Sequence, residues 1–342
     1  MIGPRIELLA AFGPYEGGWH PGEFHQPEGL ASDSQGNLYV ADETNHRVQK
    51  ITADGEPLWA ASAVGPDGKP QLGTAAGQFF MLRGVAVDED DFLFVADAWN
   101  HRVQKLDASG TFQMMFGSYG NGPGQFGGAG PNGIAFDQDG YIYVSDTHTY
   151  LGGNNRIQKF DHLGRFVSTF GGYGTGPGQF AGGCPLRGRL GHEIHRGALS
   201  PEGPYGLAIG KSSGHLYASD SENNRIQVLD LDGALLRSIG EGILFGPRHI
   251  CLDSKENVYV AGFHWLPDME GIGPAEPIGP QHRFAWILDK DGNLLAKITA
   301  EAAHGLFEHS GGRHHAVAVS KADEGLVYIQ AGHHILKFRV HW

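Results

Sequence analysis

Short runs in which apolar and polar residues alternate recur along the whole chain, and Gly, Asp or Asn residues separate them. One unit of this pattern is residues 131–174, which reads PNGIAFDQDGYIYVSD, an inserted loop, and then NNRIQKFDHLGRFVSTFGGYG. Alternation with a period of two is typical of strands, and short polar turns between strands favour antiparallel pairing. Each unit therefore predicts one small sheet of four antiparallel strands.

The unit recurs, and its copies begin near Pro27, Leu82, Pro131, Pro204, Pro247 and His314. The last copy has three strands before the chain ends, whereas residues 5–12 form a lone apolar strand at the start. If that strand completes the last copy, the sheets close into a ring and protect their edges. We therefore expect an all-β fold, a six-bladed β-propeller of four-stranded blades, in a single domain that covers residues 1–342.

Residues 45–48 and residues 100–103 both read NHRV. They resemble the signature of NHL repeats, and the similarity covers nearly the whole chain. The resemblance implies a six-bladed β-propeller, in agreement with the pattern of strands. Among NHL proteins, the stretch LYASDSENNRIQVLD at residues 216–230 is similar to a bacterial branch that resembles peptidyl-α-hydroxyglycine α-amidating lyases.

Composition and charge narrow the classes of partner and compartment. The formal net charge of −13 is spread along the chain, which favours solubility and disfavours nucleic acid or an anionic membrane as a partner. The two cysteines, Cys184 and Cys251, do not indicate a disulfide framework. Because no secretory signal or membrane-spanning run is apparent, we expect a cytoplasmic protein, or an exported one whose signal has been removed.

An Asp residue ends the second strand of four units, shortly before an Asn-x-Arg element. These residues are Asp42, Asp97, Asp146 and Asp220. A carboxylate at this place can accept backbone N–H bonds and pair with the Arg, which would join the second and third strands. We therefore assign these residues to the fold rather than to chemistry.

Connections between blades, and between the second and third strands of a blade, emerge on one face of a propeller. The long insertions all belong to this class, and they are residues 64–80, 147–154, 180–203, 264–281 and 301–312. The connections on the other face are short, uniform turns. Long ordered loops on a rigid scaffold are where functional residues concentrate, so we expect the site on this loop face.

The residue before the small residue of each innermost strand is expected to point toward the mouth of the central channel. These residues are Glu28, Arg83, Asn132, Tyr205, Arg248 and His315, and none is apolar. Arg83 and Arg248 could hold a carboxylate or phosphate, and Tyr205 could move a proton. The candidates for substrate contact are Glu28, Asn132 and Arg313. Exposure of the channel mouth to solvent would also favour polar residues there, even without a functional site.

Histidine is concentrated in the second half of the chain, where thirteen of the nineteen follow Leu190. His148, His264 and His333 each follow the end of a second strand by the same step. Equivalent positions around a ring converge on its axis, so these imidazoles and His315 could bind Zn²⁺ or another transition metal. A single histidine is more often exposed or bonded to a loop carbonyl, so the prediction depends on the group as a whole.

Two other sets of histidines provide alternatives. His46 and His101 belong to the repeated signature, and we assign them to packing. His192 and His195 resemble a helical zinc pair, but they are three rather than four residues apart and lie in a Gly-rich insertion. Either His46 or the pair His192/His195 could replace one of the proposed ligands.

The resemblance to amidating lyases implies a Zn²⁺ held by histidines at the channel mouth, with Tyr and Arg close to the substrate. By position, His315 and His46 fall where ligands of that family lie. The chain departs from the family pattern at Tyr205, where the family has a ligand His, and at Ser221, where it has an Arg. We therefore expect a relative with a rearranged metal centre rather than an unaltered amidating lyase.

The leading hypothesis is a metal-dependent lyase or hydratase/hydrolase that acts on a small polar, anionic substrate at the loop-rich channel mouth. The metal would polarise a hydroxyl, a water or a carbonyl. The alternative is a non-catalytic NHL module that binds protein or RNA, although the charge disfavours RNA and no RING or coiled-coil segment is apparent. A lactonase-like hydrolase with calcium in the channel is a further alternative, for which Glu28 and Asn132 are the innermost-strand candidates.

Overall fold

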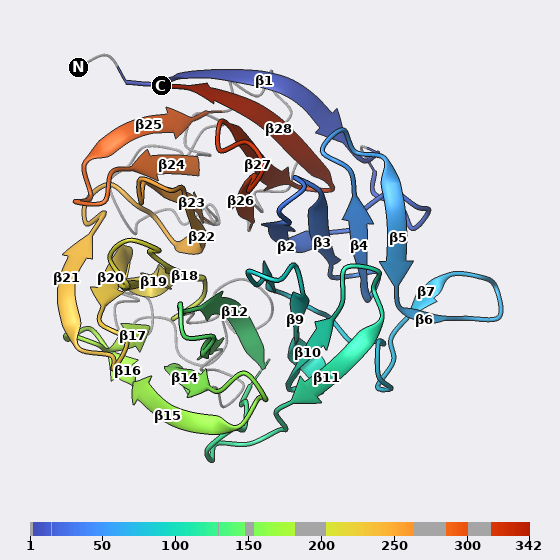
Figure 1. Ribbon diagram of the computed structural model, residues 1–342, viewed down its shortest axis with the longest axis horizontal. Coiled ribbons are helices and arrows are strands. Elements are labelled where there is room, and N and C mark those ends of the chain that lie inside the picture. The colour runs from blue at the N-terminus through green and yellow to red at the C-terminus, as the bar shows by residue number, and fades with distance from the viewer. Residues whose placement is uncertain are drawn as a thin grey trace, which may run out of the picture.

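Six four-stranded antiparallel sheets surround a central axis in the computed structural model (Figure 1). This arrangement confirms the predicted six-bladed, all-β propeller. The structure describes residues 3–14, 16–128, 130–147, 154–181, 203–262, 285–299 and 316–342. Among these residues, no helix is long and apolar enough to cross a membrane.

In the first three blades, the strands follow one another in chain order from the axis to the rim. Blade one contains β2 (Pro27–Ser32), β3 (Leu38–Asp42), β4 (Arg47–Ile51) and β5 (Pro57–Ala61). Blade two contains β8 (Val85–Val87), β9 (Leu93–Asp97), β10 (Arg102–Leu106) and β11 (Phe112–Phe116). Blade three contains β12 (Pro131–Phe136), β13 (Ile142–Asp146), β14 (Arg156–Phe160) and β15 (Phe166–Gly171).

The other three blades have the same plan, except that the last strand of blade six comes from the start of the chain. Blade four contains β18 (Leu207–Ile209), β19 (Leu216–Asp220), β20 (Arg225–Leu229) and β21 (Leu235–Ile239). Blade five contains β22 (Pro247–Leu252), β23 (Val258–Gly262), β24 (Ala285–Leu288) and β25 (Leu294–Ile298). Blade six contains β26 (Val317–Val319), β27 (Leu326–Ala331), β28 (His334–His341) and β1 (Arg5–Phe12).

Short elements occur in the connections on the loop face. Two small pairs are β6 (Ala63–Val64) with β7 (Pro70–Gln71), and β16 (Tyr173–Gly174) with β17 (Phe180–Ala181). Two 3₁₀ turns, η1 (Ala98–Asn100) and η4 (Ser221–Asn223), connect the second and third strands of blades two and four. Each 3₁₀ turn ends at a residue in the left-handed conformation, His101 with φ 54° and Asn224 with φ 54°.

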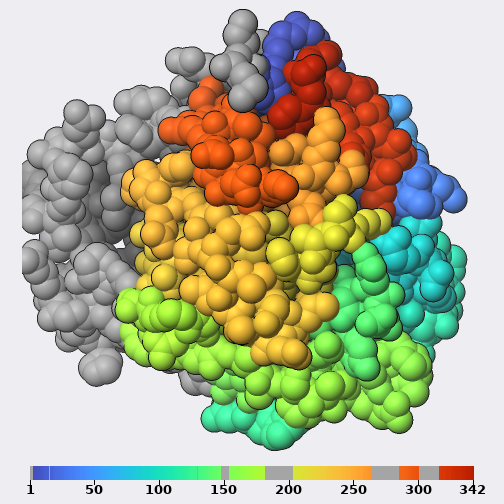
Figure 2. Space-filling model, turned by 60° about the vertical axis from the view of Figure 1, so that its left-hand side comes forward, coloured from blue at the N-terminus to red at the C-terminus, as the bar shows by residue number. Residues whose placement is uncertain are grey.

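The N-terminal strand closes the ring, as predicted. β1 pairs antiparallel with β28 from Arg5 opposite His341 to Phe12 opposite Ile335, with a register shift between Leu8 and Ala10. The blue N-terminal segment accordingly lies against the red C-terminal strand in both views (Figures 1 and 2). The pairing covers the outer edge of β28, which would otherwise present unpaired backbone groups to another chain.

Apolar side chains fill the spaces between neighbouring blades. Tyr39 and Val48 of blade one pack with Phe79 and Val85 on the blade-two side, for example, and all are at most 5% exposed. Close to the axis there is no room for a side chain: a Cβ atom on Gly84 would lie 2.0 Å from the carbonyl oxygen of Asn132 in the next blade. Glycine is therefore required at residue 84, whereas blade five has His249 at the equivalent register position of β22.

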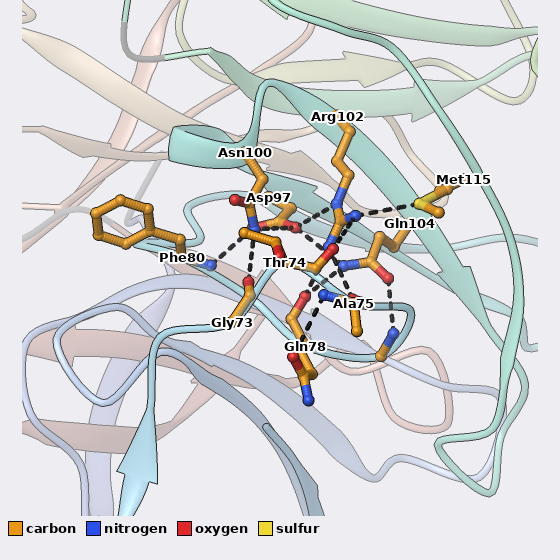
Figure 3. A network of polar contacts seen from close by, with 11 residues as sticks. Gly73, Thr74, Ala75, Gln78, Phe80, Asp97, Asn100, Arg102, Gln104 and Met115 are labelled. Carbon is orange, nitrogen blue, oxygen red and sulfur yellow. Dashed lines mark hydrogen bonds and ion pairs between the residues drawn. The ribbon is translucent and has the colours of Figure 1, made fainter. Parts of the chain in front are cut away.

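The repeated Asp is the centre of a buried polar network, shown for blade two in Figure 3. The Asp97 carboxylate, which is fully buried, accepts hydrogen bonds from Phe80 N (2.8 Å), Asn100 Nδ2 (2.9 Å) and Arg102 Nε (2.7 Å). The remaining Arg102 nitrogens donate to the carbonyl oxygens of Thr74, Ala75 and Gln78. The Asp–Arg pair thus ties the second and third strands to the connection from the previous blade, which supports the structural assignment of the repeated Asp.

The same pair recurs in three other blades. Its distances are 2.7 Å for Asp42–Arg47, 3.0 Å for Asp146–Arg156 and 2.9 Å for Asp220–Arg225. All three carboxylates are fully buried. Burial raises the pKa of each of these Asp residues, and the hydrogen bonds and the Arg charge oppose that rise.

A side chain next to the Arg of the signature joins each of several blades to the following one. His46 Nδ1 accepts a hydrogen bond from Met81 N (3.2 Å), and Asn224 Oδ1 accepts one from Gly246 N (2.8 Å). In these two blades the signature position provides an acceptor on a left-handed residue, a neutral imidazole in one and an amide in the other. This contact accounts for His46 as part of the fold.

Candidate functional site

Four of the six positions that the sequence places at the channel mouth contact one another across the axis. The Tyr205 hydroxyl donates to Glu28 Oε2 over 2.9 Å and accepts from Arg83 Nη1 over 3.1 Å. The guanidinium carbon of Arg248 lies 5.0 Å from the centroid of the Tyr205 ring. These residues belong to the innermost strands of blades one, two, four and five, or directly precede them. We call them the axial group.

A further contact of the axial group, Glu43, was not predicted from the sequence. It follows Asp42 at the end of β3, and its Oε1 lies 3.9 Å from Arg83 Nη2. Blades two to four have Ala98, Thr147 and Ser221 at the same register position, so Glu43 is the acidic member of a set of small residues. That difference between the repeats is the signal that could have identified it.

The site around the axial group is almost completely buried. Tyr205 is 2% exposed, Glu43 4% and Glu28 5%. Water is therefore largely excluded from the two carboxylates, and pairing with the partly buried arginines offsets the cost of their desolvation. The ring of Tyr205 also interacts favourably with the Arg248 cation above it. Such an arrangement can hold an anion and can move a proton through the Tyr205 hydroxyl.

Asn132 lies near the same end of the innermost strands but is not joined to the axial group by a described contact. Its side chain is fully buried, and Nδ2 makes one long contact of 3.4 Å with Gly130 O. Within the described part of the chain, Oδ1 has no hydrogen-bond partner. Because an unsatisfied buried acceptor costs about 1–3 kcal/mol, this oxygen marks a place where a donor would be stabilised.

Of the four histidines proposed as metal ligands, only His333 belongs to the described residues. It lies in the turn between β27 and β28, where Nδ1 accepts a hydrogen bond from Gln26 N (3.1 Å). The centroid of its ring lies 4.9 Å from that of the His25 ring. It thus has the same role between blades six and one that His46 has between blades one and two. Burial, followed by the neighbouring His25 and His334, lowers the pKa of His333.

The other proposed ligands lie outside the described residues, as do several alternatives. They are His148, His264, His315, Arg313, His192 and His195. The described residues contain no group of three or more His, Cys, Asp or Glu side chains that could hold a metal. The fit of a metal to this chain is therefore not tested by the described residues, and its ligand set stays a prediction.

The opposite face of the propeller has contacts between blades that are not neighbours. Lys321, which follows β26 of blade six, donates to the carbonyl oxygens of Val87 and Asp88 in blade two, both over 3.0 Å. Lys211, which follows β18 of blade four, pairs with Glu89 of blade two over 3.0 Å. Since these contacts link non-adjacent blades on the face of the short turns, we expect ligands to reach the axial group from the loop face.

The sequence matches the family model described as NHL repeat at residues 24–51, 81–106 and 203–229, which fall in blades one, two and four. These segments contain the Asp–Arg pairs that tie the blades together. The chain is an NHL-repeat β-propeller.

Relatives of this NHL propeller include enzymes and a zinc finger protein. Peptidyl-glycine alpha-amidating monooxygenase from Mus musculus is 25% identical over 64% of this chain and 24% of its own length. The probable peptidyl-alpha-hydroxyglycine alpha-amidating lyase pgal-1 from Caenorhabditis elegans is 30% identical over 41% of this chain and 38% of its own length. B-box type zinc finger protein ncl-1 from the same organism is 31% identical over 56% of this chain and 19% of its length. This NHL propeller therefore spans less than half the length of these relatives.

Solved structures confirm the propeller fold at low identity. A gluconolactonase from Xanthomonas campestris has a TM-score of 0.59 and 16% identity, with 99% of this chain and 94% of that chain covered. A streptogramin B lyase has a TM-score of 0.55 and 13% identity, with 99% and 98% covered. At such identities the likeness shows the fold of this NHL propeller alone.

Proposed function

We propose that this NHL propeller is a metal-dependent lyase or hydratase/hydrolase that acts on a small anionic substrate at the loop-face end of the axis. The observation that carries the proposal is the position of the Tyr205 hydroxyl between Glu28 and Arg83, with Arg248 against its ring. A buried proton donor between a carboxylate and a guanidinium is an arrangement suited to proton transfer.

Each member of the axial group has a role in this proposal. Tyr205 exchanges a proton with the substrate, and Glu28 accepts the hydrogen bond of its hydroxyl over 2.9 Å. Arg83 donates to the phenolic oxygen over 3.1 Å and stabilises negative charge that develops there. Arg83 and Arg248 together attract the anionic end of the substrate. Glu28 and Asn132 complete the contacts, and Arg313 stays a proposed contact outside the described residues.

The proposed metal ligands are His148, His264, His315 and His333. A bound transition metal, most simply Zn²⁺, would supply polarisation of a substrate hydroxyl, water or carbonyl. We assign no step to it, because three of these histidines lie outside the described residues. A structural calcium ion in the central channel is a separate proposal.

The names of related proteins support an enzymatic function for this chain. They include an amidating monooxygenase and an amidating lyase. The similarity to ncl-1 favours the second candidate, a recognition module that binds protein or RNA. A recognition module would not require a buried Tyr–Glu–Arg group, so the effect of altering Tyr205 on turnover separates the two.

The test begins with a screen of hydroxyglycine peptides and lactones, with metal content measured on tag-free protein. Tyr205→Phe keeps the ring beneath Arg248 but removes the hydroxyl, so we expect kcat to fall about 10²–10⁴-fold while the fold is kept. Tyr119→Phe is the matched control, because Tyr119 lies on the same face and is 66% exposed. Equal activity of the two variants would overturn the role of Tyr205. Metal content that is negligible, and unchanged in His264→Ala and His315→Ala, would overturn the metal.

A further inference from the structure

A row of aromatic side chains lies on the chain segments that lead to Arg83 and Glu43, and the proposed reaction does not use it. The ring of His46 is 5.6 Å from that of Phe80, and the ring of Phe80 is 5.6 Å from that of Trp99. Trp99 is 41% exposed although it is one of the largest apolar side chains in the protein. We call His46, Phe80 and Trp99 the aromatic ledge.

The fold does not require aromatic residues at these places. Trp99 is the middle residue of η1, and the equivalent residues are Thr44 in blade one and Glu222 in blade four. Phe80 N donates to Asp97 over 2.8 Å, and Ala181 N makes the same contact with Asp220 over 3.1 Å. Because polar or small residues serve the same backbone contacts elsewhere, the aromatic character of the ledge has another cause.

The ledge adjoins the charged residues at the axis at two points. Phe80 lies three residues before Arg83, and His46 lies three residues after Glu43. Glu43 and Arg83 are 3.9 Å apart, so both chain segments lead from the ledge to the same guanidinium. In Figure 3 the ring of Phe80 points away from the Asp97 network, and the residue is partly exposed.

We infer that the aromatic ledge is a subsite for an aromatic or large apolar group of the substrate, next to the anionic end that the arginines hold. This inference rests on the proposed function, because it takes the axial group as the place of the negative charge. Exposed aromatic surface beside a charged pocket is typical of ligand sites, and stacked rings add affinity beyond the area that they bury. The substrate class that fits is a carboxylic acid with a ring a few bonds from the carboxylate.

Isothermal titration with small probes tests the subsite without knowledge of the natural substrate. The probes are acetate, 3-phenylpropanoate and the neutral 3-phenylpropanamide. The variants are Trp99→Thr and Phe80→Ala, which introduce the residues of equivalent positions in blades one and four, and Trp342→Thr as a control on a Trp that is 54% exposed at the C-terminus. We expect 3-phenylpropanoate to bind the parent at least about tenfold more tightly than acetate. Both ledge variants should lose this advantage, and Trp342→Thr should keep it.

The outcomes separate the ledge from the proposed function. Equal binding of acetate and 3-phenylpropanoate to the parent, or an advantage that both ledge variants retain, would overturn the ledge. If both ledge variants retain the advantage but 3-phenylpropanamide binds more weakly than 3-phenylpropanoate, the anion site of the proposed function is still supported. If the amide and the acid bind equally and both depend on Trp99, the ledge is upheld and the anion anchor of the proposed function is wrong.

Discussion

Replacement of Arg102 by Met tests how the repeated Asp–Arg pair holds the propeller together. The substitution keeps an apolar stem but removes the donors to Asp97 and to the carbonyl oxygens of Thr74, Ala75 and Gln78. The Asp97 side chain is fully buried, and that of Arg102 is 10% exposed. Removal of one partner from a buried ion pair typically costs about 3–5 kcal/mol, because the other charge stays buried.

The expected shift in melting temperature follows from the length of the chain. With an unfolding entropy of about 2.1 cal/mol/K per residue, each kcal/mol of lost stability lowers the melting temperature of a 342-residue chain by about 1.4 °C. Arg102→Met should therefore lower the midpoint in differential scanning calorimetry by about 4–7 °C. Burial raises the pKa of Asp97, and loss of Arg102 raises it further. The folded variant then takes up a proton more readily than the unfolded chain. The difference in melting temperature between the variant and the parent should therefore become smaller as the pH falls from about 8 to about 5.

Arg165→Met provides the matched control. Arg165 Nε pairs with Asp161 over 2.6 Å, a distance close to that of the buried pair, but its side chain is 71% exposed. Solvent screens such a pair, so we expect its midpoint to stay within about 1 °C of the parent. The double variant Asp97→Asn/Arg102→Met removes the orphaned charge and should recover part of the loss. If Arg102→Met costs no more than Arg165→Met, burial of the pair is not what stabilises the blade.

Two further predictions concern the contacts between blades. Burial lowers the pKa of His46, so the unfolded chain binds a proton that the folded protein does not, and stability is lost as the pH falls below about 6.5. His46→Asn copies the pH-insensitive acceptor of Asn224, so thermal unfolding should show a smaller loss between pH 7 and pH 5 than in the parent; an equal loss would contradict the role of His46. Deletion of residues 1–12 should expose β28 and cause aggregation in light scattering, whereas deletion of residues 1–4, which leaves all of β1, should not.

The axial positions were predictable from the sequence because a ring of repeats places equivalent residues at equivalent radii. Alignment of the innermost strands was enough to identify Glu28, Arg83, Tyr205 and Arg248. The contacts among them were not predictable. Whether Tyr205 meets Glu28 or Arg83 depends on side-chain length and rotamer across the axis, between residues that are 177 and 122 positions apart.

His333 also shows that register in the sequence does not predict the contact that a side chain makes. His333 shares its register with His148 and His264, which favoured a common role at the axis. The structure adds a contact that register did not predict: Nδ1 accepts from Gln26 N, since the turn between β27 and β28 brings this histidine to the place that His46 occupies in blade one. Register predicts which face of the propeller a side chain occupies, but the length of the local turn decides its partner.

The sequence by itself determined the number of blades, the closure by residues 5–12 and the buried Asp–Arg pairs. These features follow from short-range periodicity, because hydrogen-bonded strands and tight turns are encoded within a few residues. Only the tertiary structure decided that Glu43 joins Arg83, that Tyr205 lies between Glu28 and Arg83, and that Phe80 and Trp99 form a ledge beside them. Such contacts depend on how the blades pack around the axis, and that geometry is a property of the closed ring.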